Sequence, residues 1–204
     1  MKSGLKNKKL GKNFYKADVL SVAKSLLGKI LVKKNSSRFI AGKIVEVEAY
    51  DGDTDQAAHS YGGITTRNEI MFDEGGYLYV YLSYGVHFCC NVVTGVKNKG
   101  TAVLIRAVEP LEGIEVMCKN RFGKKVVSEK EMLNLTSGPG KVCKAFGIEK
   151  KHSGSDLTGD KIFILNSPLG ENEKIASSKR IGITKSAHLP WRFFLKSNPY
   201  LSRK

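Results

Sequence analysis

Apolar residues recur at helical spacing in one early segment and alternate with polar residues in the segments that follow. Residues 17–27 (ADVLSVAKSLL) place their apolar side chains on one helix face, and Gly28 would end that helix. KILVKK (29–34) and RFIAGKIVEVEAY (38–50), joined by the turn NSS, read as strands. The first quarter of the chain is therefore predicted to form a helix and two paired strands.

The same pattern predicts further strands and two helices downstream. Two strand-like runs in GGYLYVYLSYGVHFCCNVVTGV (75–96) flank a turn at 83–85, which is typical of a β-hairpin. Strands are also predicted for TAVLIRAVEP (101–110), DKIFIL (160–165) and KRIGITKS (179–186), and helices for LEGIEVMCKNRF (111–122) and the end of SGPGKVCKAFGI (137–148). No repeat or domain boundary interrupts them, so we expect one α+β domain, residues 13–204, built around an antiparallel sheet.

Composition adds a strongly basic character. The 204 residues hold 34 Lys and Arg against 19 Asp and Glu, a formal net charge of +15. Such a field attracts polyanions, above all nucleic acid, although a lysine-rich soluble protein is an equal alternative. Residues 1–12 (MKSGLKNKKLGK) lack apolar periodicity and are predicted to form a basic, flexible arm rather than a secretory signal. No apolar run is long enough to span a bilayer, so we expect a cytoplasmic protein.

The stretch VEVEAYDGDTDQAAHS (45–60) concentrates acidic residues beside a histidine. On a strand, Glu46, Glu48 and Tyr50 face one side and the residues between them the other. The plain interpretation is a half-buried strand whose polar face meets water. Alternatively, the loop brings His59 near the glutamates, where a carboxylate could activate water and offset the positive charge of an oxocarbenium-like transition state.

A metal site in this stretch is a weaker alternative. Asp51, Asp53, Asp55 and His59 could supply ligands. However, DGDTDQAAH lacks the later glycine and terminal glutamate of a calcium-binding EF-hand loop, so no metal is expected. The four cysteines show no zinc spacing and are expected to be reduced, buried thiols.

The predicted hairpin carries a row of tyrosines. Tyr77, Tyr79 and Tyr81 share a strand face, which is common in cross-strand packing. Tyr84 differs, because it lies at the turn, where exposure is expected. A ring on a protruding turn can enter DNA between base steps, and enzymes that act on a base hold it, flipped out, against aromatic faces. A basic surface, a wedge, aromatic rings and a carboxylate together favour cleavage of an N-glycosidic bond in a flipped nucleotide.

In these motifs the chain resembles the alkyladenine (3-methyladenine) DNA glycosylase family, the type without a helix-hairpin-helix. Five blocks follow the family order over nearly all of the chain after about residue 12: VEVEAYDGDTDQAAHS, RNEIMFDEGGYLYVYLSYGVHFCCNVV, AVLIRAVEPLEG, SGPGKVCKAFGI and RIGITKSAHLPWRFF. The resemblance implies a compact α+β domain with a curved antiparallel sheet, a protruding hairpin and flanking helices, and neither metal nor cofactor. It also implies a monofunctional enzyme of base excision repair that flips an alkylated or deaminated purine out of duplex DNA and hydrolyses its N-glycosidic bond.

The resemblance also implies roles for individual residues. Glu48 would be the general base that activates water, and Arg106 would hold the water and the glutamate. The base pocket would comprise Tyr50, Ala58, His59, Tyr79, Tyr81 and Asn91. Tyr84 would intercalate, and Arg67 and Lys141 are candidate contacts to the DNA backbone.

Two other classes stay open on the residues alone: a non-catalytic nucleic-acid-binding module of the same fold, and an enzyme acting on RNA or a free nucleoside. The intact set of Glu48, Tyr50 and His59 speaks against the first, and the wedge Tyr84 against the second. The expected partner is double-stranded DNA with damaged purines, bound by a monomer in the bacterial cytoplasm, at the nucleoid while it acts. The loop from His59 to Arg67 is shorter than in animal members, which leaves the preferred lesion open.

Overall fold

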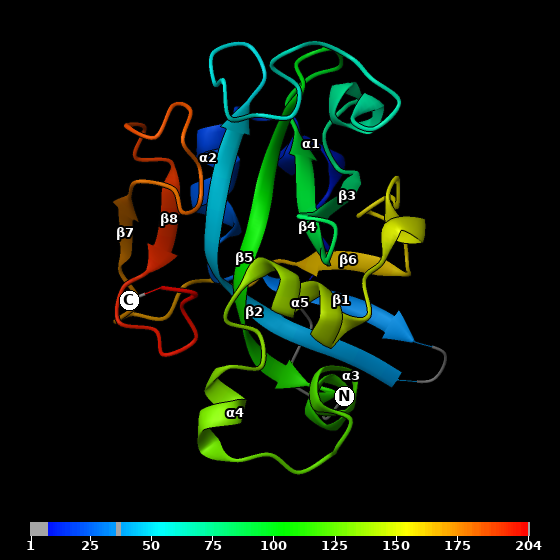
Figure 1. The fold of residues 1–204 in the computed structure, drawn as a ribbon, viewed down its shortest axis with the longest axis vertical. Helices are drawn as coiled ribbons and strands as arrows, with labels where there is room; N and C mark the ends of the chain where they lie inside the picture. The colour runs from blue at the N-terminus through cyan, green and yellow to red at the C-terminus, as the bar shows by residue number, and fades with distance from the viewer. Residues whose placement is uncertain (1–7, 36–37, 204) are drawn as a thin grey trace.

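A curled antiparallel sheet forms the centre of the domain, as a half-barrel (Figure 1). The computed structural model describes residues 8–35 and 38–203. Within them the strands follow the order β3-β4-β5-β2-β1-β6, and β8 joins β2 on one side and β7 on the other. The strands are β1 (Ile30–Asn35), β2 (Arg38–Asp51), β3 (Leu78–Ser83), β4 (His87–Thr94), β5 (Thr101–Glu112), β6 (Ile162–Leu165), β7 (Ile175–Ser178) and β8 (Arg192–Leu195). The expected fold class is confirmed.

Short helices cover the sheet and complete the core. They are α1 (Lys12–Tyr15), α2 (Val19–Leu26), α3 (Ile114–Phe122), α4 (Glu129–Leu133) and α5 (Pro139–Phe146), with 3-10 turns η1 (Glu69–Phe72) and η2 (Lys150–His152). Asp18 caps α2 by accepting the N–H of Ser21, and Gly147 ends α5 at a φ of 62°. α2 packs on β2 and β5, and α5 on β4 and β5. None of the helices in the described ranges is long and apolar enough to cross a membrane.

Three register shifts interrupt the pairing of β2 with β5, and two of them flank Glu46. The register passes from Ile44 opposite Val108 to Glu46 opposite Ala107, and then to Val47 opposite Ile105. Bulges bend a strand and redirect its side chains. Here they allow the buried Ala107 and Val108 to contribute consecutively to the core, while Arg106 turns to the opposite side of the sheet.

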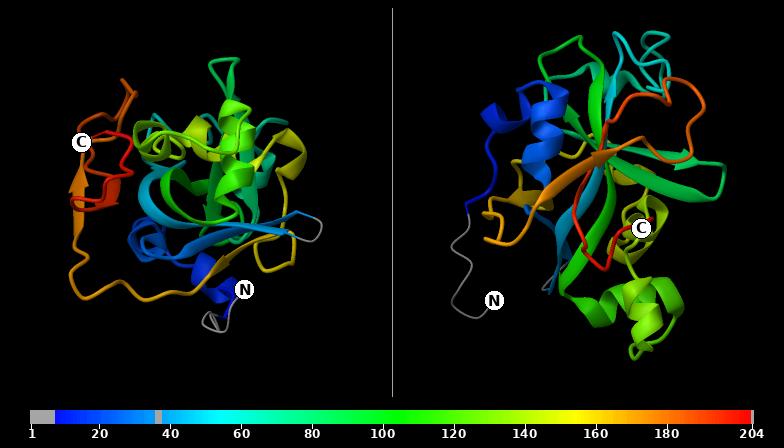
Figure 2. Two further views of the ribbon diagram at one scale, coloured as in Figure 1. Left: turned by 90° about the horizontal axis from the view of Figure 1, so that it is seen from below. Right: turned by 90° about the vertical axis from the view of Figure 1, so that its left-hand side faces the viewer.

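The β3–β4 hairpin projects from the body of the domain, as both views of Figure 2 show. Its strands pair from Leu78 with Val92 to Ser83 with His87, so that residues 84–86 form the turn. Tyr84 has a φ of 50° and Gly85 a φ of 68°. Both values lie in the left-handed region that tight hairpin turns require. The predicted hairpin is confirmed, and its turn is the outermost part.

The predicted strand at 179–186 (KRIGITKS) is wrong. The strand in this region is β7, which ends at Ser178, and residues 179–186 form an irregular loop. The alternation of Ile181 and Ile183 with polar residues misled the prediction. In the structure, the N–H of Ile181 donates to a glutamate side chain and Gly182 has a φ of 74°, so neither group extends a strand ladder.

The basic arm predicted over residues 1–12 falls partly outside the described residues. Residues 1–7 lie outside the described residues, but residues 8–12 pack on the domain. The side chain of Leu10 is buried, and its N–H donates to the carbonyl of Ile164 at 2.8 Å. The Lys9 ammonium lies 4.6 Å from the ring centre of Phe163. Residue 10 is therefore part of the folded domain.

Gly75 provides a test of how tightly this core is assembled. A Cβ added there would overlap the carbonyl oxygen of Tyr15, at the point where α1 meets the end of β4. We expect Gly75→Ala to lower the free energy of unfolding by about 3 kcal/mol, because rigid backbone must move. Gly62, with nothing within 4 Å of an added Cβ, is the control and should change stability by less than ~1 kcal/mol. Urea denaturation of both variants measures the difference, and equal stabilities would contradict the packing.

Candidate active site

A cleft of about 510 Å³ opens beside the β3–β4 hairpin. Strands β2, β3, β4 and β5 supply one part of its wall. The loops at 57–67 and 181–183, together with Met71 of η1, Tyr84 of the hairpin turn and Pro139 of α5, supply the rest. The side chains that matter for its chemistry are Tyr50, His59, Arg67, Tyr79, Tyr81, Tyr84, Cys89, Asn91, Leu104, Arg106 and Ile181. Most of the predicted site residues therefore meet at one cavity.

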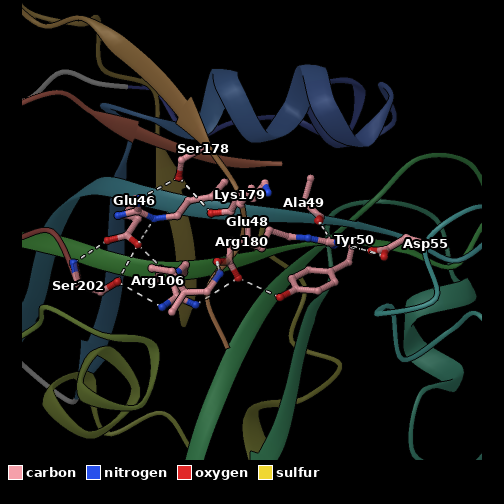
Figure 3. Close-up of polar contacts among 12 residues, drawn as sticks. Glu46, Glu48, Ala49, Tyr50, Asp55, Arg106, Ser178, Lys179, Arg180 and Ser202 are labelled. Carbon is pink, nitrogen blue, oxygen red and sulfur yellow. Dashed lines mark hydrogen bonds and ion pairs between the residues drawn. The ribbon is translucent and has the colours of Figure 1, made fainter. Parts of the chain in front are cut away.

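Glu48 is fully buried beneath the floor of this cleft and is not itself part of the lining. Its Oε2 accepts hydrogen bonds from the Tyr50 hydroxyl at 2.9 Å and from Arg106 Nη1 at 3.1 Å. Its Oε1 accepts the Ile181 N–H at 2.7 Å. Figure 3 shows the carboxylate between the Arg106 guanidinium and the Tyr50 ring. All three donors belong to residues that line the cleft, so the carboxylate is held in place directly beneath it.

Glu46, two residues earlier, is an anchor behind the floor. It is also fully buried, and its carboxylate accepts Arg106 Nε at 3.0 Å, Arg192 Nε at 2.8 Å and the Ser202 N–H at 2.6 Å. Burial alone would raise the pKa of Glu46, but the hydrogen bonds from Ser202 and the two arginines outweigh it and lower that pKa. Glu46 thus orients Arg106 toward Glu48. Neither carboxylate is part of the lining, but Glu48 bonds three lining residues and Glu46 only Arg106.

Aromatic rings form the walls above the floor. Tyr79 and Tyr81 are stacked with ring centres 5.5 Å apart. The imidazole of His59 stands edge-on to Tyr81 at 4.4 Å, and its Nδ1 lies 3.0 Å from the Tyr79 hydroxyl. Burial raises the pKa of both Tyr50 and Tyr81, so these phenols keep their protons. Flat, uncharged walls of this kind suit a planar heterocycle.

His59 is neutral in this setting. Desolvation by the cleft walls, together with the nearby guanidinium of Arg67, lowers the pKa of His59 to about 4. A neutral imidazole can donate from one ring nitrogen and accept at the other. It can therefore hold a base edge or a sugar-phosphate group without bringing a positive charge to the cleft.

The turn residue Tyr84 stands at the mouth of the cleft with 89% of its surface exposed. Leu82 and Val86 beside it are also exposed. This is the placement that the position of Tyr84 in the sequence predicted.

Asn91 and Cys89 lie side by side in register opposite the tyrosines of β3. Asn91 faces Tyr79 and donates from Nδ2 to its carbonyl oxygen at 3.3 Å, which directs the amide along the cleft wall. Burial raises the pKa of Cys89 to about 11, so its thiol is protonated. All four cysteines are free and buried, as expected.

Besides Glu48, two candidate residues are not part of the cleft lining. Ala57, not Ala58, lines the cleft, while Ala58 is buried in the loop behind it. Lys141 does not line the cleft, and its ammonium donates to Asn134 and Ser137 within the α4–α5 region. Arg67 does reach the cleft, with its guanidinium carbon 5.6 Å from the ring centre of Tyr81.

The aspartates that were candidate metal ligands are engaged with the protein. Asp55 forms a buried, two-point ion pair with Arg180, and Asp53 pairs with Lys99 at 3.0 Å. Across residues 8–35 and 38–203, no three His, Cys, Asp or Glu side chains are placed to share a metal ion.

Sequence reasoning missed Arg180, Ile181 and Ser202. Arg180 and Ile181 lie in the motif RIGITKSAHLPWRFF, but the apolar alternation at its start predicts a strand, and Ser202 lies beyond the motif. The useful indication was Arg180 itself. Most basic residues of the chain are lysines, and an arginine among apolar residues is a candidate for a buried ion pair.

Comparison with known proteins agrees with this geometry. The model of the methylpurine-DNA glycosylase family matches residues 13–199. The chain belongs to this family. A protein from Clostridium novyi (strain NT), named "Putative 3-methyladenine DNA glycosylase", is 47% identical over 203 residues, 97% of this chain and 100% of its own. Proteins of the same name from Carboxydothermus hydrogenoformans (47%; 96% of this chain and 99% of its own) and Bacillus cereus (46%; 94% and 98%) are similar throughout.

Membership in the methylpurine-DNA glycosylase family confirms the resemblance inferred from the motifs. It makes the protein a DNA glycosylase, a hydrolase that acts on damaged DNA, and removes the non-catalytic module as an alternative. The relatives named here are bacterial.

The low pKa of His59 leads to a test. The pKa of His59 is about 4 in the folded protein and about 6.5 in the unfolded chain. As the pH drops, the unfolded chain therefore binds a proton at His59 first, and stability falls between about pH 6.5 and pH 4.

Replacing Arg67 by Gln removes the nearby charge, so the pKa of His59 should rise toward its ordinary value. NMR titration of the His59 ring protons measures it, with His188, outside the cleft, as internal control. An unchanged pKa in Arg67→Gln would assign the whole shift to desolvation.

Proposed function

We propose that this protein is a monofunctional glycosylase that flips an alkylated or deaminated purine from duplex DNA and hydrolyses its N-glycosidic bond with a water activated by Glu48. The observation that carries the proposal is a carboxylate fixed by three donors beneath a cleft with aromatic walls. Membership in the methylpurine-DNA glycosylase family supports the substrate class.

DNA capture uses the basic surface and the hairpin. Lysine and arginine side chains bind phosphates, and Tyr84 enters the duplex at the position of the damaged nucleotide. Its exposed ring and the left-handed turn that presents it support the role. Arg67, at the cleft mouth, contacts the backbone of the flipped nucleotide, whereas the contact of Lys141 would lie outside the cleft.

The flipped base stacks between Tyr50 and the cluster of Tyr81 and His59. His59, kept neutral, donates to or accepts from the base edge or the adjoining backbone. The Asn91 amide, held by the Tyr79 carbonyl, obstructs the exocyclic amine of an undamaged guanine. Selection then rests on pocket shape and on the weakness of the bond to be cut.

Hydrolysis follows from the charges on the cleft floor. Glu48 takes a proton from water, whose oxygen bonds to C1′ while the C1′–N bond breaks and its electrons pass to the base. Arg106 positions the water and the carboxylate, and the negative carboxylate offsets the oxocarbenium charge of the sugar. A base alkylated at N3 or N7 is cationic and leaves neutral, without a proton donor. The product is an abasic site, and we expect the enzyme to act as a monomer at the bacterial nucleoid.

The Glu48→Gln variant tests the chemistry. Glutamine keeps the size of the side chain and an oxygen for the Ile181 N–H but cannot take a proton from water. We expect it to bind lesion duplex and to lose excision on the order of 10²–10⁴-fold. The assay incubates a duplex carrying one 7-methylguanine with enzyme and EDTA and reveals abasic sites with alkali.

The control for this experiment is Glu109→Gln, which removes a carboxylate that pairs with Lys43 outside the cleft. It should excise at the wild-type rate. Full activity in Glu48→Gln would overturn the assignment of the base, and wild-type protein that binds the duplex without cutting would overturn the proposed function.

Tyr84→Ala tests the wedge. Because the ring is 89% exposed, its removal should change the free energy of unfolding by less than ~0.5 kcal/mol. It should weaken capture of a lesion in duplex DNA far more than in a single strand, where no stacked gap has to be filled. Val126→Ala, another highly exposed apolar side chain outside the cleft, is the matched control. Equal losses on both substrates would argue against intercalation.

A further inference from the structure

Arg180 and Asp55 form a fully buried ion pair close to the cleft but not in its wall. The guanidinium makes two hydrogen bonds to the carboxylate, from Nη1 to Oδ2 and, at 2.8 Å, from Nη2 to Oδ1. A buried pair of this kind often contributes little to net stability, because both ions lose their hydration. Its position relative to the cleft suggests what else it does.

Arg180 lies between two parts of the proposed active site, the Tyr50 ring and the loop that binds Glu48. Its guanidinium carbon lies 4.6 Å from the ring centre of Tyr50, and its Nη1 also donates to the carbonyl of Ala49 at 2.9 Å. Tyr50 lines the cleft and Arg180 does not, so the guanidinium backs the ring on the side turned away from the cleft. The next residue, Ile181, donates its N–H to Glu48. One side chain thus supports the stacking ring and the loop that holds the carboxylate (Figure 3).

The charge behind Tyr50 affects what can stack in front of it. A cation over one face of an aromatic ring already interacts with the ring quadrupole. A cationic base on the other face is then attracted less strongly. Two unit charges ~8 Å apart at an effective dielectric constant of ~20 repel enough to change an equilibrium constant roughly 30-fold. Asp55, bonded to Arg180 at two points, cancels this charge at its source.

We propose that the Asp55–Arg180 pair is a positioning and specificity device. Arg180 holds Tyr50 and the Glu48-binding loop in place, and Asp55 neutralises Arg180 so that a cationic purine can stack on Tyr50. The inference rests on the proposed function, because it assumes that a flipped base occupies the cleft. It assigns to residues outside the cleft a part in the choice between cationic and neutral lesions.

Variants that change the charge in opposite directions test the specificity role. Asp55→Asn leaves a positive charge behind Tyr50, and Arg180→Met leaves a negative one. Single-turnover excision of 7-methylguanine reports the cationic base, and fluorescence-detected affinity for an ethenoadenine duplex reports a neutral one. The test quantity is the ratio of the 7-methylguanine excision rate to the affinity for the ethenoadenine duplex. For Asp55→Asn we expect this ratio to fall about tenfold. For Arg180→Met the ratio should rise.

The double variant Asp55→Asn/Arg180→Met tests the positioning role. Because neither of the two substituted side chains would carry a charge, the ratio of 7-methylguanine excision rate to ethenoadenine affinity should stay within about threefold of wild type. Both the rate and the affinity should fall, because Tyr50 and Ile181 lose their support. Lys43→Gln, which removes an ion-pair cluster with Glu109 and Glu173 outside the cleft, controls for stability and should alter neither measure. Unfolding curves establish that each variant is folded.

The outcomes separate the two proposals. An unchanged ratio in whichever single variants fold overturns the specificity role, and wild-type values in the double variant overturn the positioning role. Wild-type protein that neither excises 7-methylguanine nor binds the ethenoadenine duplex would instead overturn the proposed function.

Discussion

The burial of two carboxylates on one strand, Glu46 and Glu48, is the constraint on which the site depends. Each ion loses hydration worth several kcal/mol, so each must be surrounded by donors. Arg106 comes from β5, the strand beside β2, while Arg192, Ser202 and the loop after β7 come from the end of the chain. Satisfying the carboxylates therefore brings the C-terminal segments against the sheet, and the bulge in β5 aims Arg106 between the two glutamates.

In this arrangement, the Glu48–Arg106 pair and the aromatic rings occupy different parts of the site. Glu48 lies beneath the floor and bonds Arg106 in the lining, while the aromatic walls consist of protonated tyrosines and a neutral histidine, with the Arg67 guanidinium beside Tyr81. Because the donors are already in place, little reorganisation is needed when positive charge develops on a sugar above them. The walls present flat surfaces to a purine without competing for that charge.

Much of this could be predicted from local pattern. Alternation along β2 correctly placed Glu46, Glu48 and Tyr50 on one face, and the position of Tyr84 at a turn predicted its exposure, because period and turn chemistry are short-range properties. The same reasoning failed at residues 179–186, where apolar alternation resembles a strand but the backbone N–H of Ile181 is taken by Glu48. In the loop after β2, where no period indicates which side chain faces inward, the choice of Ala58 came from the family motif, and the structure places the neighbouring Ala57 in the cleft lining.

The sequence by itself determined the α+β class, the hairpin with its exposed tyrosine, the family and most residues of the cleft. It left Glu46 and Glu48 equivalent in periodicity, and only the family motif distinguished them. The tertiary structure separated Glu46, an anchor for Arg106, from Glu48, bonded to three lining residues beneath the cleft. It also revealed the Asp55–Arg180 pair behind Tyr50. The physical reason is that the partner of a buried charge is chosen by three-dimensional proximity. Here Arg106 lies 58 residues from Glu48, Arg180 lies 125 from Asp55 and Ser202 lies 156 from Glu46.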